Sequence, residues 1–267
     1  RAMYKFILFS VSIVVLIFIY VKYIESRSIF LPTRELEFNP GYINLAFEDI
    51  YIKTDDGLKI NGWFIPANNP KYTVIFFHGN GGNIGHRLEK ISLLNKIGIN
   101  NFIIDYRGYG RSQGKPSEAG LYLDAKAAYD YLINVRKINP ENIILYGESI
   151  GTAVVIDLAA KVKVKAVILE GGFTSGKEMA RNVFSLIPNF LFSDKFNSLK
   201  KINRVKAAKL FLHSRNDEIV PLILARKLFD YASEPKSFVE LIGSHNTAFL
   251  DSQEKYLSSI ASFIGQL

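Results

Sequence analysis

Residues 143–151 read IILYGESIG, and this stretch decides how the rest of the chain is interpreted. The apolar run suits a buried strand, and the residues from Thr152 onward suit a helix. The G-x-S-x-G pattern between them is typical of a chain that turns from strand to helix within about three residues. Such a turn strains the serine backbone, which is why glycines flank it, and exposes the hydroxyl at the helix N-terminus. The sequence therefore predicts that Ser149 is a nucleophile and not only a helix cap.

A serine hydroxyl is a weak nucleophile unless a neutral imidazole takes its proton, so a histidine must be found. Where the serine lies on such a turn, the chain order is serine, acid, histidine. Only His213 and His245 follow Ser149. His213 ends an apolar run and is interpreted as structural, and His86 opens a helical stretch and should be exposed. His245 lies in a Gly-Ser-His-Asn loop after an apolar run, and it is the predicted base.

The acid should orient the imidazole and stabilise its charged form. Asp217 lies in a loop just past an apolar run and just before Pro221, which suits the first turn of a helix. Glu218 beside it and Glu170 at the end of an earlier run are the rivals. Asp217 is preferred, and the predicted triad is Ser149, Asp217 and His245.

Acyl transfer also needs hydrogen-bond donors for the developing oxyanion. The backbone N–H of Ile150, directly after the serine, is one candidate. The other is the backbone N–H of Asn80, in the loop FHGNGGN at 77–83. A glycine-rich phosphate loop is the alternative, but neither of its two usual glycine spacings is present.

The order of apolar runs and helical stretches predicts an α/β fold with a mostly parallel eight-stranded sheet. A hairpin is expected first, because a Thr-Asp-Asp-Gly turn separates 47–53 from 58–65. Short apolar runs then suit strands that are covered on both faces: 73–77, 101–106, 142–146, 166–169, 209–212 and 237–242. Helical spacing of apolar residues marks the connections: 85–97, 119–135, 150–161, 222–231 and 252–264.

Residues 173–206 interrupt this order with no clear strand–helix unit. Within them 183–196 is rich in phenylalanine, and several basic residues follow up to Lys209. An insertion at this point would lie over the carboxyl edge of the sheet, where ligands bind, so a lid-like role is expected. The alternative is an ordinary helix beside solvated lysines.

Residues 6–21 carry no charge and are bracketed by Lys5 and Lys22, with tyrosines near both ends. This pattern predicts a single-pass membrane anchor over 1–25, a connector over 26–46 and a catalytic domain over 47–267. A cleaved signal peptide is less favoured because no small-x-small site follows, and a core helix because the run lacks a polar face. The flanking basic residues leave the orientation across the membrane open.

Composition narrows the classes of function. The net charge of +8 would suit an anionic partner, but no nucleic-acid-binding motif is present, so no nucleic acid is expected as partner. The chain has no cysteine, which excludes disulfides, thiolate metal sites and a cysteine nucleophile. No metal and no organic cofactor is expected.

Five motifs in this order resemble the membrane-anchored branch of the α/β-hydrolase family: HGNGGN at 78–83, DYRGYGRSQG at 105–114, GESIG at 147–151, HSRNDEIVP at 213–221 and GSHN at 243–246. That branch includes protein depalmitoylases and lipid-acting esterases. The resemblance covers about residues 35–267 and implies an eight-stranded sheet with the triad assigned above. One departure is Ser214, where the family usually has glycine.

The expected function is therefore serine-dependent hydrolysis of an acyl ester or thioester, with a hydrophobic acyl chain presented at a membrane. The membrane would be contacted through the N-terminal helix and through 183–209. A serine peptidase of the same fold needs the same triad and remains an alternative. A non-catalytic binding protein on the membrane is the other alternative, and the intact set of site residues disfavours it.

Overall fold

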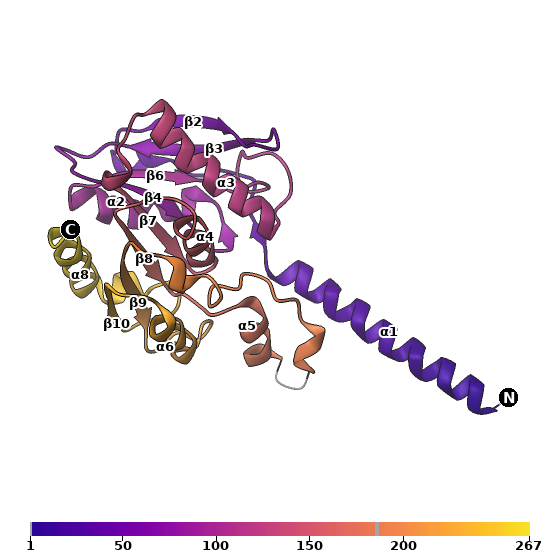
Figure 1. The fold of residues 1–267 in the computed structure, drawn as a ribbon. Coiled ribbons are helices and arrows are strands. Elements are labelled where there is room, and N and C mark those ends of the chain that lie inside the picture. The colour runs from indigo at the N-terminus through magenta and orange to yellow at the C-terminus, as the bar shows by residue number, and fades with distance from the viewer. Residues whose placement is uncertain (1, 185–186) are drawn as a thin grey trace.

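The computed structural model describes residues 2–184 and 187–267 of the chain. Residue 1 of the predicted anchor and residues 185–186 of the predicted lid-like insertion lie outside the described residues. The described chain forms a central sheet flanked by helices on both faces, with a long N-terminal helix that projects away from it (Figure 1).

The central sheet has eight strands in the order β10-β9-β8-β7-β4-β6-β3-β2. Their bounds are β2 Glu48–Lys53, β3 Lys59–Ile65, β4 Thr73–Phe77, β6 Asn100–Ile104, β7 Ile143–Glu148, β8 Ala166–Glu170, β9 Ala208–Ser214 and β10 Lys236–Leu241. Strands β2, β3 and β6 pair antiparallel, and all other neighbours in the sheet pair parallel. The predicted fold class, including its antiparallel start, is confirmed.

Burial explains why the inner strands read as continuous apolar runs. Every residue of β4 and β8 is buried, because helices cover both faces of these strands. Strand β2 lies at the edge and alternates exposed and buried residues over its second half. Because β4, β6, β7, β8, β9 and β10 run parallel, their carboxyl ends lie along one edge of the sheet, where loops from distant parts of the chain meet.

Helices α3, α4 and α6 pack on one face of the sheet, and α2 and α8 pack on the other (Figure 1). Their bounds are α2 Leu88–Lys96, α3 Glu118–Asp130, α4 Ile150–Ala159, α6 Leu222–Tyr231 and α8 Gln253–Gly265, with a short α7 at Ala248–Asp251. The single-turn elements are η1 Pro40–Ile43, η2 Ile84–Arg87, η3 Tyr131–Val135, η4 Pro140–Asn142, η5 Asn189–Leu191 and η6 Ile202–Arg204. The helices expected from sequence are all present, although η2 forms the first turn of the first one.

Two features of the fold do not follow from the apolar pattern. Helix α5, Gly176–Val183, lies inside the segment for which no strand–helix unit was expected. A two-stranded parallel ladder joins β1, Leu31–Pro32, to β5, Gly81–Gly82. Strand β1 lies in the connector, so the chain that leaves the N-terminal helix is bonded directly to the loop after β4.

Helix α1, Ala2–Ser28, is long and apolar enough over Met3–Ile24 to cross a membrane. At about 1.5 Å per residue its 22 residues measure about 33 Å, which matches a hydrocarbon core of about 30 Å. Most of its described side chains are exposed, whereas Val21 is buried, with 3% of its surface accessible. Its length and composition fit a membrane anchor or a signal sequence.

Candidate active site

Ser149 lies between the end of β7 and the start of α4, in a strained backbone conformation with φ of 53°. The turn is possible only because glycines flank it. A Cβ on Gly147 would lie 2.5 Å from the carbonyl oxygen of Gly151, and one on Gly151 would lie 2.0 Å from the carbonyl oxygen of Phe77. Strain of this kind in a non-glycine residue is concentrated at functional sites, because the surrounding structure must hold it in place.

His245 and Asp217 form a hydrogen-bonded pair on the loops after β10 and β9. Nδ1 of His245 lies 2.7 Å from Oδ2 of Asp217, and the two side chains are 8% and 2% exposed. Oδ1 of Asp217 accepts hydrogen bonds from the backbone N–H groups of Ile219 and Val220, which fix the carboxylate. The rival Glu218 accepts instead from the backbone N–H of His245, at 3.0 Å.

The pKa values of the pair move in opposite directions. Burial lowers the pKa of His245, but its hydrogen bond to Asp217 and the charge of that carboxylate outweigh burial and raise the pKa above its ordinary 6.5. Burial raises the pKa of Asp217, but the same contacts with His245 outweigh it and hold that pKa below its ordinary value. The carboxylate thus stabilises the imidazolium that would form when His245 accepts a proton.

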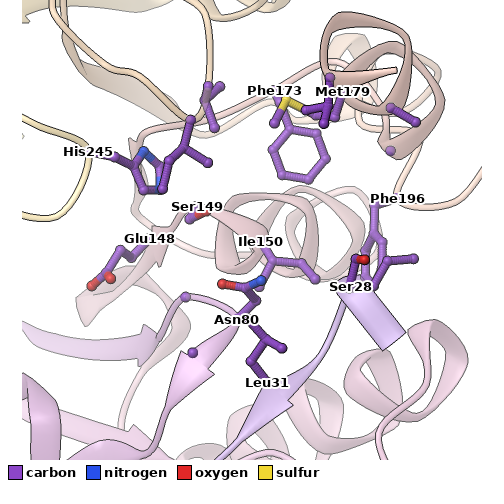
Figure 2. A pocket seen from close by; sticks show the side chains of 18 of the residues that line it. Ser28, Leu31, Asn80, Glu148, Ser149, Ile150, Phe173, Met179, Phe196 and His245 are labelled. Carbon is purple, nitrogen blue, oxygen red and sulfur yellow. The ribbon is translucent and has the colours of Figure 1, made fainter. Parts of the chain in front are cut away.

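Gly171 shows how close the histidine lies to the serine. A Cβ at this position would be 3.0 Å from Cε1 of His245 and 3.8 Å from the backbone nitrogen of Ser149. The backbone N–H of Ser149 also donates to the carbonyl oxygen of Glu170, at 2.8 Å. The end of β8 therefore brings the loops that carry the two side chains together, and the side chains of Ser149 and His245 line one cavity (Figure 2).

The two residues assigned to the oxyanion hole line the same cavity. Ile150 is the first residue of α4, where a helix N–H has no acceptor within its own helix. Among the described residues the N–H of Asn80 has no acceptor, whereas its carbonyl oxygen accepts from Leu31 N–H and from the Tyr109 hydroxyl. The hydrogen bonds to the carbonyl oxygen of Asn80 thus hold the loop after β4 in place, and the N–H of Asn80 stays available as a donor.

A buried ionic cluster lies next to the nucleophile and was not anticipated from the sequence. Nζ of Lys90 lies 3.1 Å from Glu148 and 2.7 Å from Glu170, and Nε of Arg87 lies 3.4 Å from Glu148. Burial raises the pKa of Glu148, but the charges of Arg87 and Lys90 outweigh it and lower that pKa to about 2. Glu170 also accepts a short hydrogen bond from the Tyr146 hydroxyl. Glu170 is therefore committed to this cluster and does not contact His245.

The other histidines have structural positions. His213 is buried, and its Nε2 lies 2.9 Å from the carbonyl oxygen of Val220. His86 is exposed, as expected, and His78 is buried with Nδ1 near the carbonyl oxygen of Gly79. In residues 2–184 and 187–267 no group of three or more histidine, aspartate or glutamate side chains is arranged to hold a metal ion.

Comparison with known proteins shows the family of the chain. Residues 68–201 match a family model described as "Serine aminopeptidase, S33". The chain is 36% identical to alpha/beta hydrolase domain-containing protein 17B of Homo sapiens over 224 residues, which cover 83% of this chain and 76% of that protein. It is also 36% identical to protein bem46 of Schizosaccharomyces pombe over 251 residues, which cover 88% and 82%.

The chain belongs to the α/β-hydrolase family. Solved structures share its fold at lower identity. The Pyrococcus furiosus esterase Pf2001 superimposes with a TM-score of 0.73 at 23% identity, covering 90% of this chain and 98% of that one. An α/β-hydrolase of Vibrio vulnificus gives a TM-score of 0.69 at 23% identity, covering 81% of each chain. Membership of this family supports hydrolase activity.

In this α/β-hydrolase the departure at Ser214 has a structural role. Its hydroxyl donates to the carbonyl oxygen of Gly243, at 2.5 Å, and accepts from the backbone N–H of Asn216, at 3.1 Å. The serine therefore links the loop that carries Asp217 to the loop that carries His245. A glycine at this position could form neither bond.

Besides the ionic cluster, two further contributors to the site were missed in the sequence. Gly171 lies at the carboxyl end of an apolar run and begins a Gly-Gly pair, and that position was a readable signal. Strand β1 consists of only two residues, so no periodicity marks it. Both act through backbone proximity, which a side-chain pattern does not report.

Proposed function

We propose that this α/β-hydrolase is a serine hydrolase that cleaves acyl esters or thioesters. The observation that carries the proposal is a strained Ser149 beside the Asp217–His245 pair at one end of an apolar cavity of about 570 Å³. This volume lies within the range of sites for small organic ligands. The lining is largely apolar, which suits an acyl chain better than a charged substrate.

In the proposed mechanism, His245 removes the proton of the Ser149 hydroxyl as its oxygen attacks the acyl carbonyl carbon. The backbone N–H groups of Asn80 and Ile150 would stabilise the oxyanion, and one such donor contributes about 3–4 kcal/mol. Collapse breaks the bond to the alcohol or thiol, which leaves with the proton from His245. A water molecule, deprotonated by His245, then attacks the acyl carbon, and the Ser149 oxygen leaves with the proton from His245 as the carboxylic acid is released.

We further propose that α1 anchors the enzyme in a membrane. Two exposed apolar side chains near its end favour this placement, since Phe190 is 77% and Val183 is 65% exposed. The lysines expected to contact the membrane are partly used within the domain. Lys201 bonds Asp157, and Lys209 is buried against the carbonyl oxygen of Ala207. Membrane contact by 183–209 therefore rests on its apolar residues more than on these lysines.

The test is hydrolysis of p-nitrophenyl esters and of acyl thioesters by the purified full-length chain in detergent. Turnover of either class that is lost in Ser149→Ala supports the proposal. Absence of turnover of both classes by a folded wild-type protein would refute it.

A serine peptidase is the second candidate, and the description of the matching family model favours it. The same serine, acid and histidine would cleave an amide, with His245 protonating the leaving amine. Aminoacyl p-nitroanilides distinguish the two functions. A peptidase would cleave these anilides with kcat/KM at least equal to that for p-nitrophenyl butyrate, and an esterase would leave them almost intact.

A further inference from the structure

The cavity beside Ser149 extends to the C-terminal end of helix α1. Three residues of the last turns of α1 or directly after it line the cavity together with the site residues, namely Ile24, Ser28 and Ile29. Figure 2 shows Ser28 and Phe196 at the far end of the cavity from His245. The N-terminal helix is therefore part of the substrate cavity.

The position of α1 relative to the active site is fixed by backbone bonds. Leu31, three residues after the helix ends, donates its N–H to the carbonyl oxygen of Asn80, at 3.1 Å. Thr33 donates in the same way to Gly82, at 3.0 Å. These bonds extend the ladder that joins β1 to β5, so the end of α1 is held by the same loop that supplies the oxyanion donor.

A second contact joins α1 to the segment on the opposite wall of the cavity. Val21 is buried against Leu191 and Phe192, and Nζ of Lys22 donates to the Ser193 hydroxyl, at 2.8 Å. The ring of Phe192 stacks on that of Phe184, and both rings line the cavity. Helix α1 and residues 187–196 therefore form one packed unit around the far end of the cavity.

The apolar span of α1 ends at Ile24, and the contribution of α1 to the cavity begins at that same residue. An acyl chain at this level could leave the bilayer and enter the cavity without crossing water, which avoids exposing its methylenes to water. The walls suit such a chain, because Phe173 and Met179 are apolar and line the cavity, as does Phe196 beside Ser28 (Figure 2).

We propose that the end of helix α1 forms the distal wall of an acyl-chain subsite and selects the length of the chain. This inference rests on the proposed function, and it names the substrate class as a long, single acyl chain drawn from the bilayer. The scissile carbonyl lies at Ser149, and the methyl end of the chain lies against Ile24 and Ser28. The anchor is thus a determinant of specificity as well as of location.

The test compares Ser28→Trp with the wild type on p-nitrophenyl esters of four, eight, twelve and sixteen carbons, using the full chain in detergent micelles. The indole should fill the distal end and exclude at least two methylenes. The ratio of kcat/KM for the longest ester to that for the shortest should fall about tenfold or more, mainly through KM. Ile24→Ala enlarges the same end and should shift the preference toward longer chains.

Ser12→Trp is the matched control. Ser12 lies on the same helix and its hydroxyl bonds the carbonyl oxygen four residues earlier, as that of Ser28 does, but it does not line the cavity. This variant should keep the wild-type chain-length profile. Wild-type turnover of esters with an unchanged profile in both Ser28→Trp and Ile24→Ala would overturn the subsite alone. Wild-type protein that hydrolyses no ester would instead refute the proposed function, and the subsite with it.

Discussion

The exchange Asp217→Asn tests how the acid sets the tautomer of the histidine. Oδ1 of Asp217 accepts from the N–H groups of Ile219 and Val220, at 2.9 and 2.7 Å, while Oδ2 contacts Nδ1 of His245 at 2.7 Å. An asparagine must keep its carbonyl oxygen where the two N–H groups converge, because its amide group cannot accept from them. Its NH₂ group would then face Nδ1 of His245.

An NH₂ donor at that position requires Nδ1 to carry no proton, so the neutral imidazole of His245 would carry its proton on Nε2. That nitrogen could no longer accept the proton of Ser149. A histidine held in the wrong tautomer costs a serine hydrolase about 10⁴-fold in kcat, which corresponds to about 5.5 kcal/mol of transition-state stabilisation. KM should change little, because Asp217 is not among the residues that line the cavity.

The assay is hydrolysis of p-nitrophenyl butyrate by the full chain, with Glu218→Gln as the matched control. Among the described residues Glu218 hydrogen-bonds the backbone N–H of His245 alone, through Oε2, and a glutamine oxygen can accept the same bond. This control should keep kcat within about threefold of the wild type. If Asp217→Asn retained a tenth of the wild-type kcat, the tautomer argument would be wrong.

Three further predictions concern the surroundings of the triad. Gly171→Ala places a methyl 3.0 Å from Cε1 of His245 at a φ of +63°, so kcat should fall about 10- to 100-fold in ester hydrolysis. A Cβ on Gly172 would lie 3.4 Å or more from its neighbours, so Gly172→Ala should keep most activity. Equal losses of kcat in the two variants would contradict the reasoning. Because the pKa of His245 is raised and only its neutral form accepts a proton, kcat/KM should rise with pH through a midpoint above 6.5, and a midpoint below 6.5 would count against this assignment. Lys90→Met removes the shared partner of the buried Glu170, at 2.7 Å, and the partly buried Glu148, at 3.1 Å, and should lower the free energy of unfolding in urea by about 3 kcal/mol. The exposed Lys96 on the same helix provides the control, because Lys96→Met should change the free energy of unfolding by less than about 0.5 kcal/mol.

The sheet could be predicted from the sequence because strands that are buried on both faces need apolar residues at successive positions, and such short apolar runs are easy to recognise. The proximity of Asp217 and His245 also followed from sequence, since each comes after a strand of one parallel sheet and those strand ends share an edge. Their catalytic roles remain predictions.

Helix α5 was missed although its start was readable. Ser175 and Glu178 form the Ser-x-x-Glu pattern of a helix N-terminus, and the Ser175 hydroxyl accepts from the backbone N–H of Glu178, at 3.2 Å. The cluster around Lys90 could not be predicted from the sequence, because Glu148 and Glu170 lie 58 and 80 residues after Lys90. In the sequence all three resemble ordinary surface charges. The contact of α1 with the cavity likewise depends on tertiary packing.

The central claim is that Ser149 is an activated nucleophile, and covalent labelling tests it most directly. The folded full-length chain would be incubated with a fluorophosphonate probe beside Ser149→Ala, and the modified peptide would be located by mass spectrometry. The account predicts a single adduct on Ser149 in the wild type and none in the variant. An unlabelled wild type whose folding is verified by circular dichroism would contradict it, and would favour a non-catalytic binding protein.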